Sequence, residues 1–203
     1  MKKHLLVCLL ALALASLCML PSQVQAAEET HYHCVCGADH VSIDGHTTDS
    51  SSNWKPLPFD KDGKVQWPTG GNLYYLTRDV VLDETWEVPV YGNDSSIRLC
   101  LNGYRIIMRG SDPAILLKGA APVSSGNHSV TRHDVNLLIT DCKGGGTITH
   151  EGNAKGTAVQ VCEYGRFTMY GGSITGNSAT NNGGGVYVDG TDSRFTMYGG
   201  SIT

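Results

Sequence analysis

The sequence predicts an all-β fold, a right-handed single-stranded parallel β-helix with a small irregular N-terminal cap. Three observations predict it. The ten residues RFTMYGGSIT occur twice, at 166–175 and at 194–203, 28 positions apart. Apolar and polar residues alternate within each copy, as in a strand with one buried face. Glycine-rich and asparagine-rich corners separate these strands, and no amphipathic helical pattern fits between them.

Two more diverged copies precede the exact repeat, and the insertion from Gly119 to Asp134 interrupts them. We expect this polar segment to loop off between two strands. Equivalent residues of stacked repeats lie above one another, about 4.8 Å apart. The alignment of the copies therefore predicts three interior columns: Ile115, Val159 and Val186; Leu137, Phe167 and Phe195; and Ile106, Ile148, Ile174 and Ile202.

Residues 1–26 have the pattern of a secretory signal peptide. Lys2 and Lys3 precede an apolar stretch that extends to Leu20, and Ala26 ends a sequence suited to signal peptidase. We expect cleavage after Ala26, export, and a secreted or cell-surface location. An uncleaved membrane anchor is the alternative, although the apolar run is short for a span of about 20 residues. No later stretch is long and apolar enough to predict a transmembrane segment.

The remainder divides into a cap segment, 27–72, and the β-helix repeats, 73–203. The last copy stops at Thr203 inside a repeat, so we expect a C-terminally truncated chain.

The net charge is −4, and no basic stripe indicates nucleic-acid binding. The cysteines after the expected cleavage site are odd in number and irregularly spaced, so at most one disulfide is expected. They are Cys34, Cys36, Cys100, Cys142 and Cys162.

Several segments together resemble a known family. GGGVYV at 183–188, together with FTMYGGSITGNSA at 167–179 before it, is similar to the repeats of large secreted or surface β-helix proteins of gut-type, Firmicutes-like Gram-positive bacteria. LCLNG, ITDCKGGGTIT and HYHCVCG resemble the region that precedes those repeats, and the fold resembles the pectate-lyase-like superfamily. The resemblance implies export, a parallel β-helix, and adhesion to glycans or host surfaces. It implies no defined catalytic residues.

A cluster of histidines and cysteines in the cap segment is the candidate metal site. Two thiolates and two imidazoles can hold zinc tetrahedrally, which predicts a structural zinc ion and no other cofactor. The predicted ligands are His33, Cys34, Cys36 and His40. Solvated free thiols or a local Cys34–Cys36 disulfide are the alternatives. Asp60 to Gly63 only superficially resembles a calcium loop, and we expect a turn there.

Residues on the outer face of the repeat are the candidate binding residues. If Phe167 points inward, its neighbours point outward and recur one repeat later. The candidates are Arg166, Tyr170, Arg194 and Tyr198, with Thr168 and Thr196 between them. Tyrosine rings can pack on sugars while arginine and threonine bind their hydroxyl groups. Alternatively, tyrosine and threonine are simply favourable strand residues on a solvated face.

The sequence favours a non-enzymatic surface scaffold. A glycosidase needs two facing carboxylates, and the best candidates are Asp141, Glu163 and Asp189, expected near comparable corners of successive repeats. RFTMYGGSIT itself holds no carboxylate, and its repetition indicates a periodic surface rather than a unique site. The alternative is a polysaccharide lyase or glycoside hydrolase with most of its active site outside this segment. No catalytic residue is assigned.

Overall fold

Alternating apolar and polar residues form short strands throughout the described part of the chain. The computed structural model describes residues 54–68, 73–90, 94–120, 124–125, 128–129 and 132–203, all within one of the chain's two units, Tyr32–Thr203. The strands are β1 (Lys55–Pro56), β2 (Leu73–Tyr75), β3 (Val80–Leu82), β4 (Trp86–Val88), β5 (Asp94–Cys100), β6 (Arg105–Met108), β7 (Ile115–Lys118), β8 (Ser124–Ser125), β9 (His128–Ser129), β10 (Asp134–Thr140), β11 (Thr147–His150), β12 (Val159–Cys162), β13 (Gly165–Met169), β14 (Ser173–Ile174), β15 (Val186–Asp189), β16 (Arg194–Met197) and β17 (Ser201–Ile202).

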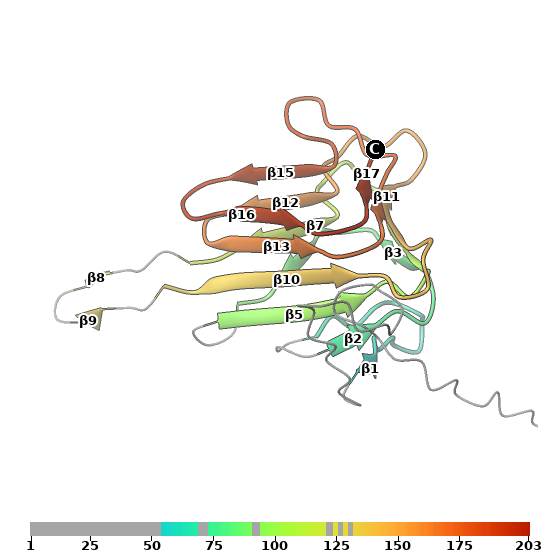
Figure 1. Cartoon of the computed structure of the whole chain (residues 1–203), viewed down its shortest axis with the longest axis horizontal. Coiled ribbons are helices and arrows are strands. Elements are labelled where there is room, and N and C mark those ends of the chain that lie inside the picture. Colours follow the sequence, from blue (N-terminus) through green and yellow to red (C-terminus); the bar gives the residue numbers. More distant parts are fainter. Residues whose placement is uncertain (1–53, 69–72, 91–93, 121–123, 126–127, 130–131) are drawn as a thin grey trace, which may run out of the picture. The chain divides into compact units, whose positions relative to one another are not determined.

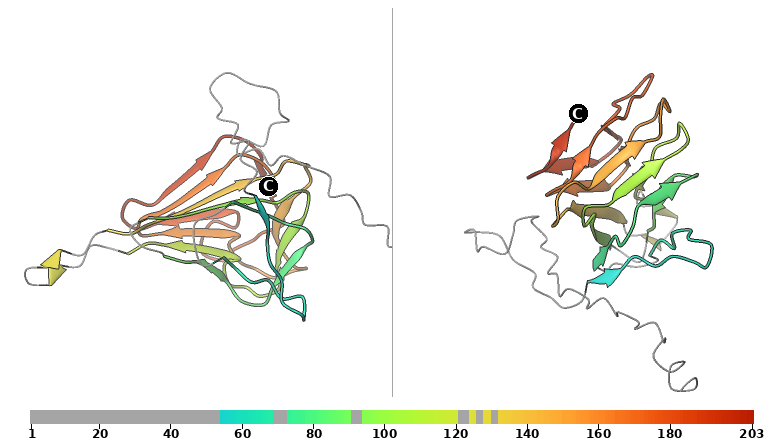
Figure 2. Two further views of the ribbon diagram at one scale, coloured as in Figure 1. Left: turned by 90° about the horizontal axis from the view of Figure 1, so that it is seen from below. Right: turned by 90° about the vertical axis from the view of Figure 1, so that its right-hand side faces the viewer.

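Three parallel sheets contain all of these strands except β8 and β9 (Figure 2). Sheet 1 has the order β1-β2-β5-β10-β13-β16, sheet 2 the order β17-β14-β11-β6-β3, and sheet 3 the order β15-β12-β7-β4. The chain enters sheets 1, 2 and 3 in turn. We call each such passage a coil: β2–β4 form coil 1, β5–β7 coil 2, β10–β12 coil 3, β13–β15 coil 4, and β16 and β17 coil 5.

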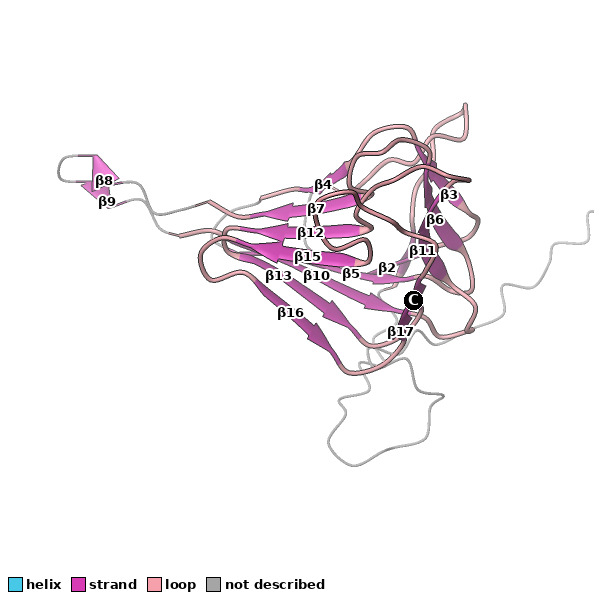
Figure 3. Ribbon diagram, turned by 90° about the horizontal axis from the view of Figure 1, so that it is seen from above, coloured by secondary structure: helices cyan, strands magenta, loops and turns pink. Residues whose placement is uncertain are grey.

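The predicted all-β class is confirmed. The described residues form strands, turns and bends without an α-helix (Figure 3). Every pairing within the three sheets is parallel. Within the same residues there is no helix with the length and hydrophobicity needed to cross a membrane.

The register of the three predicted columns is also confirmed, because each predicted neighbour is a register partner, but Ile202 in coil 5 is 40% exposed rather than interior. Val159 pairs with Ile115 and Val186, Phe167 pairs with Leu137 and Phe195, and the four isoleucines pair in sequence order. The columns continue one coil further than predicted, through Val80, Trp86 and Ile97. The inward side chains of the three sheets form one hydrophobic core, which includes Ile97, Ile106 and Ile115.

The corner after sheet 1 explains why Gly-Gly follows Tyr in both exact copies. Gly172 and Gly200 have φ values of +82° and +89°, in the left-handed region that favours glycine. A Cβ atom on Gly200 would lie 2.5 Å from the carbonyl oxygen of Gly172 in the coil beside it. The corners of coils 4 and 5 therefore approach too closely to admit a side chain at this position.

The polar insertion leaves the sheets, as the sequence predicts. An antiparallel bridge between Ala120 and His133 closes its base. Beyond this bridge, β8 and β9 pair antiparallel and lie away from the three sheets (Figure 1).

Described residues of the cap segment also contact the sheets. β1 pairs in parallel with β2 and so adds an edge strand to sheet 1. The ring of Trp67 stacks on that of Trp86, with their centroids 3.7 Å apart. The segment resembling a calcium loop is a turn, as expected, because the Asp60 Oδ1 atom accepts hydrogen bonds from the Asp62 and Lys64 amides at 2.9 and 2.8 Å.

Candidate functional site

Tyr170 and Tyr198 form a stacked pair on the outer face of sheet 1. They follow β13 and β16, whose register places equivalent residues side by side. Their ring centroids are 4.8 Å apart and the ring planes differ by 15°. The amide of Tyr170 donates to Ile139 O at 2.9 Å, and that of Tyr198 donates to Met169 O at 2.8 Å. These backbone bonds hold both tyrosines at the ends of their strands, and the side chain of Tyr198 is largely exposed at 66%.

The two predicted arginines lie on the same outer face but at its other end. Arg166 and Arg194 are register partners, as are Thr168 and Thr196. Strand residues four positions apart are separated by about 13 Å, so the arginines cannot share one sugar ring with the tyrosines. The structure therefore brings the four predicted residues together as an elongated band rather than a single pocket.

Arg166 is already paired with an acidic residue that sequence reasoning missed. Its Nε atom lies 3.2 Å from Asp134 Oδ2, and Arg132 contacts the two oxygens of Asp134 at 2.6 and 2.8 Å. Arg132 also reaches Asp192 in the corner before β16, at 2.7 Å. Arg194, in contrast, is exposed and has no ion-pair partner among the described residues. Arg194 is therefore the arginine of the band that can pair with a ligand.

Asp134→Asn is expected to lower the free energy of unfolding by about 2 kcal/mol at neutral pH, since charge-assisted hydrogen bonds are lost. The hydrogen bond from Arg132, supported by Arg166, holds the pKa of Asp134 below its ordinary value, although burial opposes this shift. A lowered pKa stabilises the fold above the unfolded-state pKa of about 3.9 and ceases to do so as the pH falls through the folded-state value. Urea unfolding of wild type and variant, compared at pH 7 and in acid, should show the difference disappearing.

Asp83→Asn is the matched control for this measurement. Asp83 also pairs with an arginine, Arg109, at 3.1 Å, but its side chain is exposed. Exposed pairs contribute about 0–1 kcal/mol, so this variant should change stability little at either pH. An Asp134→Asn effect that persisted unchanged in acid would contradict the assigned role of the carboxylate.

The expectation that Asp141, Glu163 and Asp189 lie near comparable corners of successive coils is wrong for Asp141. Asp141 follows β10 at the corner between sheets 1 and 2, whereas Glu163 and Asp189 lie at the end of sheet 3. Asp141 is buried, and its two oxygens accept hydrogen bonds from the amides of Gly103 and Gly146, each at 2.7 Å. Through these two bonds the buried carboxylate joins the corners of coils 2 and 3. It is therefore not available to a substrate.

Glu163 and Asp189 do come together, at a hollow of about 240 Å³ on the outer face of sheet 3. Lys118, Cys162 and Asp189 occupy one column across β7, β12 and β15. The Lys118 Nζ atom lies 4.0 Å from Glu163 Oε2. The lining residues are Leu116, Lys118, Gln160, Cys162, Glu163, Asp189 and Gly190. Sequence reasoning missed Lys118, although aligning the third strand of each repeat would have placed it above Asp189.

Tyr187 lies beside this hollow and donates a hydrogen bond from its hydroxyl to Asp189 Oδ2 at 3.1 Å. That hydrogen bond and the negative charge of Asp189 raise the pKa of Tyr187. A raised pKa keeps the phenol protonated at neutral pH. Its single O–H is already donated to Asp189, so the phenol serves to orient that carboxylate and is poorly suited to act as a general base.

The backbone at Glu163 and Tyr164 adopts a rare conformation. Their φ values are +27° and +61°, and side-chain-bearing residues seldom occupy this region. Backbone hydrogen bonds from two neighbouring segments hold the turn: Gly119 donates to Glu163 O at 2.7 Å, and Tyr164 donates to Thr191 O at 2.8 Å. Strain of this kind persists only where the surroundings fix it, so the position of Glu163 is rigidly set.

The predicted zinc ligands His33, Cys34, Cys36 and His40 lie outside the described residues. Within the described ranges, no group of three histidine, cysteine or acidic side chains is arranged to hold a metal. The zinc site therefore stays a prediction about the cap segment.

Comparison with known proteins identifies no relative of this chain. No family model, curated protein or solved structure matches the chain.

Proposed function

We propose that the chain is an exported, non-enzymatic right-handed parallel β-helix protein that contacts glycans or host surfaces through the outer face of sheet 1. The regular passage of the chain through three parallel sheets supports the β-helix. The signal-like N-terminus supports export to the medium or cell surface. The resemblance of the repeats to surface proteins of Gram-positive bacteria favours an adhesin-like scaffold.

The stacked pair of Tyr170 and Tyr198 is the observation that carries the glycan proposal. Two rings 4.8 Å apart cover one face of each other. The large exposure of Tyr198 leaves its remaining surface accessible to the apolar face of a sugar. Thr196 and the exposed Arg194 extend along the same strand, where they can bind hydroxyl or acidic groups of further sugar units.

The Tyr170→Ala, Tyr198→Ala double variant is expected to lose roughly 5- to 150-fold in affinity for mucin or for the glycans that wild type binds on an array. Aromatic stacking contributes about 0.5–1.5 kcal/mol for each ring. The free energy of unfolding should change by only about 1 kcal/mol, since both rings lie outside the core. Binding is measured on immobilised glycans, and stability by urea unfolding.

Tyr187→Ala is the matched control, because it removes a tyrosine from the outer face of sheet 3 instead. It should bind glycans like wild type. Unchanged binding by the double variant would contradict the tyrosine platform. If wild type binds no glycan at all, the chain is better described as a structural stalk.

The hollow of Lys118, Glu163 and Asp189 favours a second candidate function, polysaccharide cleavage of the pectate-lyase-like type. Two carboxylates beside a cation could protonate a leaving group and stabilise charge. The same glycan incubations distinguish the two functions when they are assayed for new chain ends. Cleavage that is lost in Glu163→Gln and Asp189→Asn, but retained in the tyrosine double variant, would establish the enzyme.

A further inference from the structure

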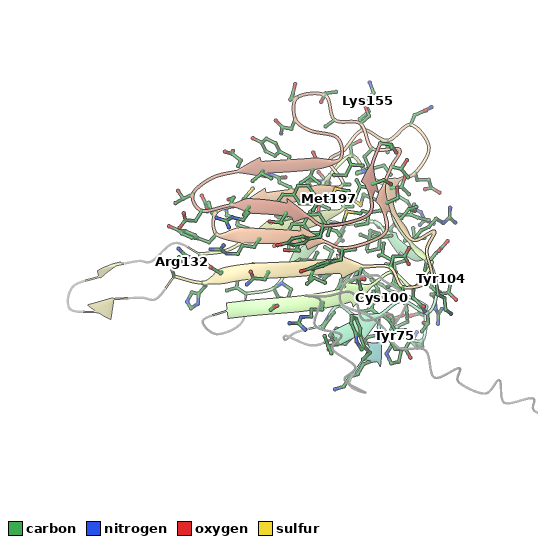
Figure 4. The ribbon with its side chains drawn as sticks, viewed as in Figure 1. Tyr75, Cys100, Tyr104, Arg132, Lys155 and Met197 are labelled. Atoms are coloured by element: carbon green, nitrogen blue, oxygen red, sulfur yellow. The ribbon has the colours of Figure 1, made fainter. Side chains whose placement is uncertain are left out.

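Two cysteines from neighbouring coils lie in contact at the corner after sheet 1. Cys100 is the last residue of β5 in coil 2 and is fully buried (Figure 4). Cys142 follows β10 in coil 3 and is half-buried. Their Sγ atoms are 3.0 Å apart, although 42 positions separate them in the sequence. The proposed glycan-binding function does not involve these thiols.

The backbone around the two sulfur atoms already brings them together. Cys100 pairs in register with Thr140, two residues before Cys142. The amide of Cys142 donates to Cys100 Sγ at 3.4 Å. A disulfide has an S–S separation of about 2.05 Å, so the sulfur atoms need to approach by only about 1 Å. Rotation of the two side chains can supply this movement without separating the strands.

Asn102 holds the same corner in place. Its Nδ2 atom donates to Leu76 O in coil 1 at 2.8 Å, and its Oδ1 atom lies 3.7 Å from Cys142 Sγ. Its φ of +53° is in the left-handed region, where asparagine is tolerated better than most residues. The corner of coil 2 is therefore fixed on one side by coil 1 and in contact with the second thiol on the other.

We propose that Cys100 and Cys142 form a disulfide that links coil 2 to coil 3. The oxidant is a small-molecule or protein disulfide. The thiolate of the more accessible Cys142 attacks one sulfur of the oxidant, forms a mixed disulfide and releases one thiol. The deprotonated Cys100 Sγ then attacks Cys142 Sγ and releases the second thiol. The two protein thiols thus lose two electrons and two protons, and the oxidant becomes two thiols.

The order of these attacks follows from the surroundings of the two sulfur atoms. The neighbouring Cys142 side chain and burial both raise the pKa of Cys100. A thiol that rarely ionises is a poor first nucleophile. Once Cys142 carries the mixed disulfide, however, Cys100 is the thiol in contact with it.

The cross-link encloses all of β6, β7 and β10 together with the insertion. It therefore limits how far coils 2 and 3 can separate in the unfolded chain. A loop of this length is expected to raise the thermal unfolding midpoint by roughly 5–15 °C. The effect should be present in the oxidised protein and absent after reduction.

The test treats the full chain with oxidised glutathione, blocks remaining thiols with N-ethylmaleimide, and maps peptides by mass spectrometry without reductant. The expected result is one cross-linked peptide pair containing Cys100 and Cys142. Cys100→Ser and Cys142→Ser should each abolish this pair and the reductant-dependent shift of the midpoint. Cys162→Ser is the matched control and should retain both, because Cys162 lies on sheet 3 beside Gln160.

Recovery of Cys100 and Cys142 as maleimide adducts after oxidation would overturn the proposal. So would a cross-link that joins either of them to Cys34, Cys36 or Cys162. If a serine variant fails to fold, the wild-type peptide map and its response to reductant still decide the question. None of these measurements involves glycan binding, so they are independent of the proposed function.

Discussion

Phe167→Ala is expected to lower the free energy of unfolding by about 3–5 kcal/mol. Phe167 is only 1% exposed and fills the centre of the column formed with Leu137 and Phe195. Its ring stacks on that of Phe195 with the centroids 5.2 Å apart. Removing it leaves a cavity between two coils that cannot close without disturbing both. Urea unfolding followed by far-UV circular dichroism measures the change.

Phe195→Ala provides a matched control for the same column. Phe195 is chemically identical, but it lies in coil 5 and is only half-buried. Among the described residues it packs against coil 4 and is only half-buried, so its truncation should cost less, about 1–2 kcal/mol. Equal losses in the two variants would contradict the assignment of coil 4 as the better-packed layer.

Asp141→Ala is the second substitution with a large expected effect, about 3–5 kcal/mol of unfolding free energy. The buried carboxylate accepts two backbone hydrogen bonds from two different coils, and its loss leaves the amides of Gly103 and Gly146 without this acceptor. Hydrogen bonds to charged groups contribute about 1.5–3 kcal/mol each. Asp141→Asn should cost less, because its single carbonyl oxygen can still accept one of them. Both values are obtained from urea unfolding.

Asp189→Asn is the corresponding control, since Asp189 is exposed at the end of β15. Its effect should stay within about 0.5 kcal/mol. If Asp141→Ala were as well tolerated as Asp189→Asn, the carboxylate would not be joining coils 2 and 3. The outcome matters for function too, because a purely structural Asp141 cannot be part of a catalytic pair.

The register of the core could be predicted from the sequence because the repeats are nearly identical. Phe167 and Phe195 occupy the same position of a ten-residue identity, so their contact follows from stacking alone. Val80 and Trp86 extend the columns without belonging to any recognisable copy. Their strands are three residues long, too short for alternation to distinguish them from loop residues.

Contacts within the candidate site could be predicted only between equivalent residues of successive repeats. The stack of Tyr170 on Tyr198 follows from the register, whereas the partner of Arg166 does not. Asp134 lies at the end of the insertion, and only the antiparallel base of that segment brings it beside sheet 1. Asp141 was misplaced because it follows the first strand of its coil, whereas Glu163 and Asp189 lie at the third strand of theirs.

Contacts between nonadjacent coils are rare in stacked repeats, so stability is approximately a sum over neighbouring layers. The tryptophans are distributed unevenly over these layers, because Trp54, Trp67 and Trp86 all precede β5. The stacked Trp67 and Trp86 rings lie at β4, the edge strand of sheet 3. Indole fluorescence therefore reports melting of coil 1, whereas circular dichroism averages over every layer. The gap between the two transition midpoints measures how strongly one layer is coupled energetically to the next.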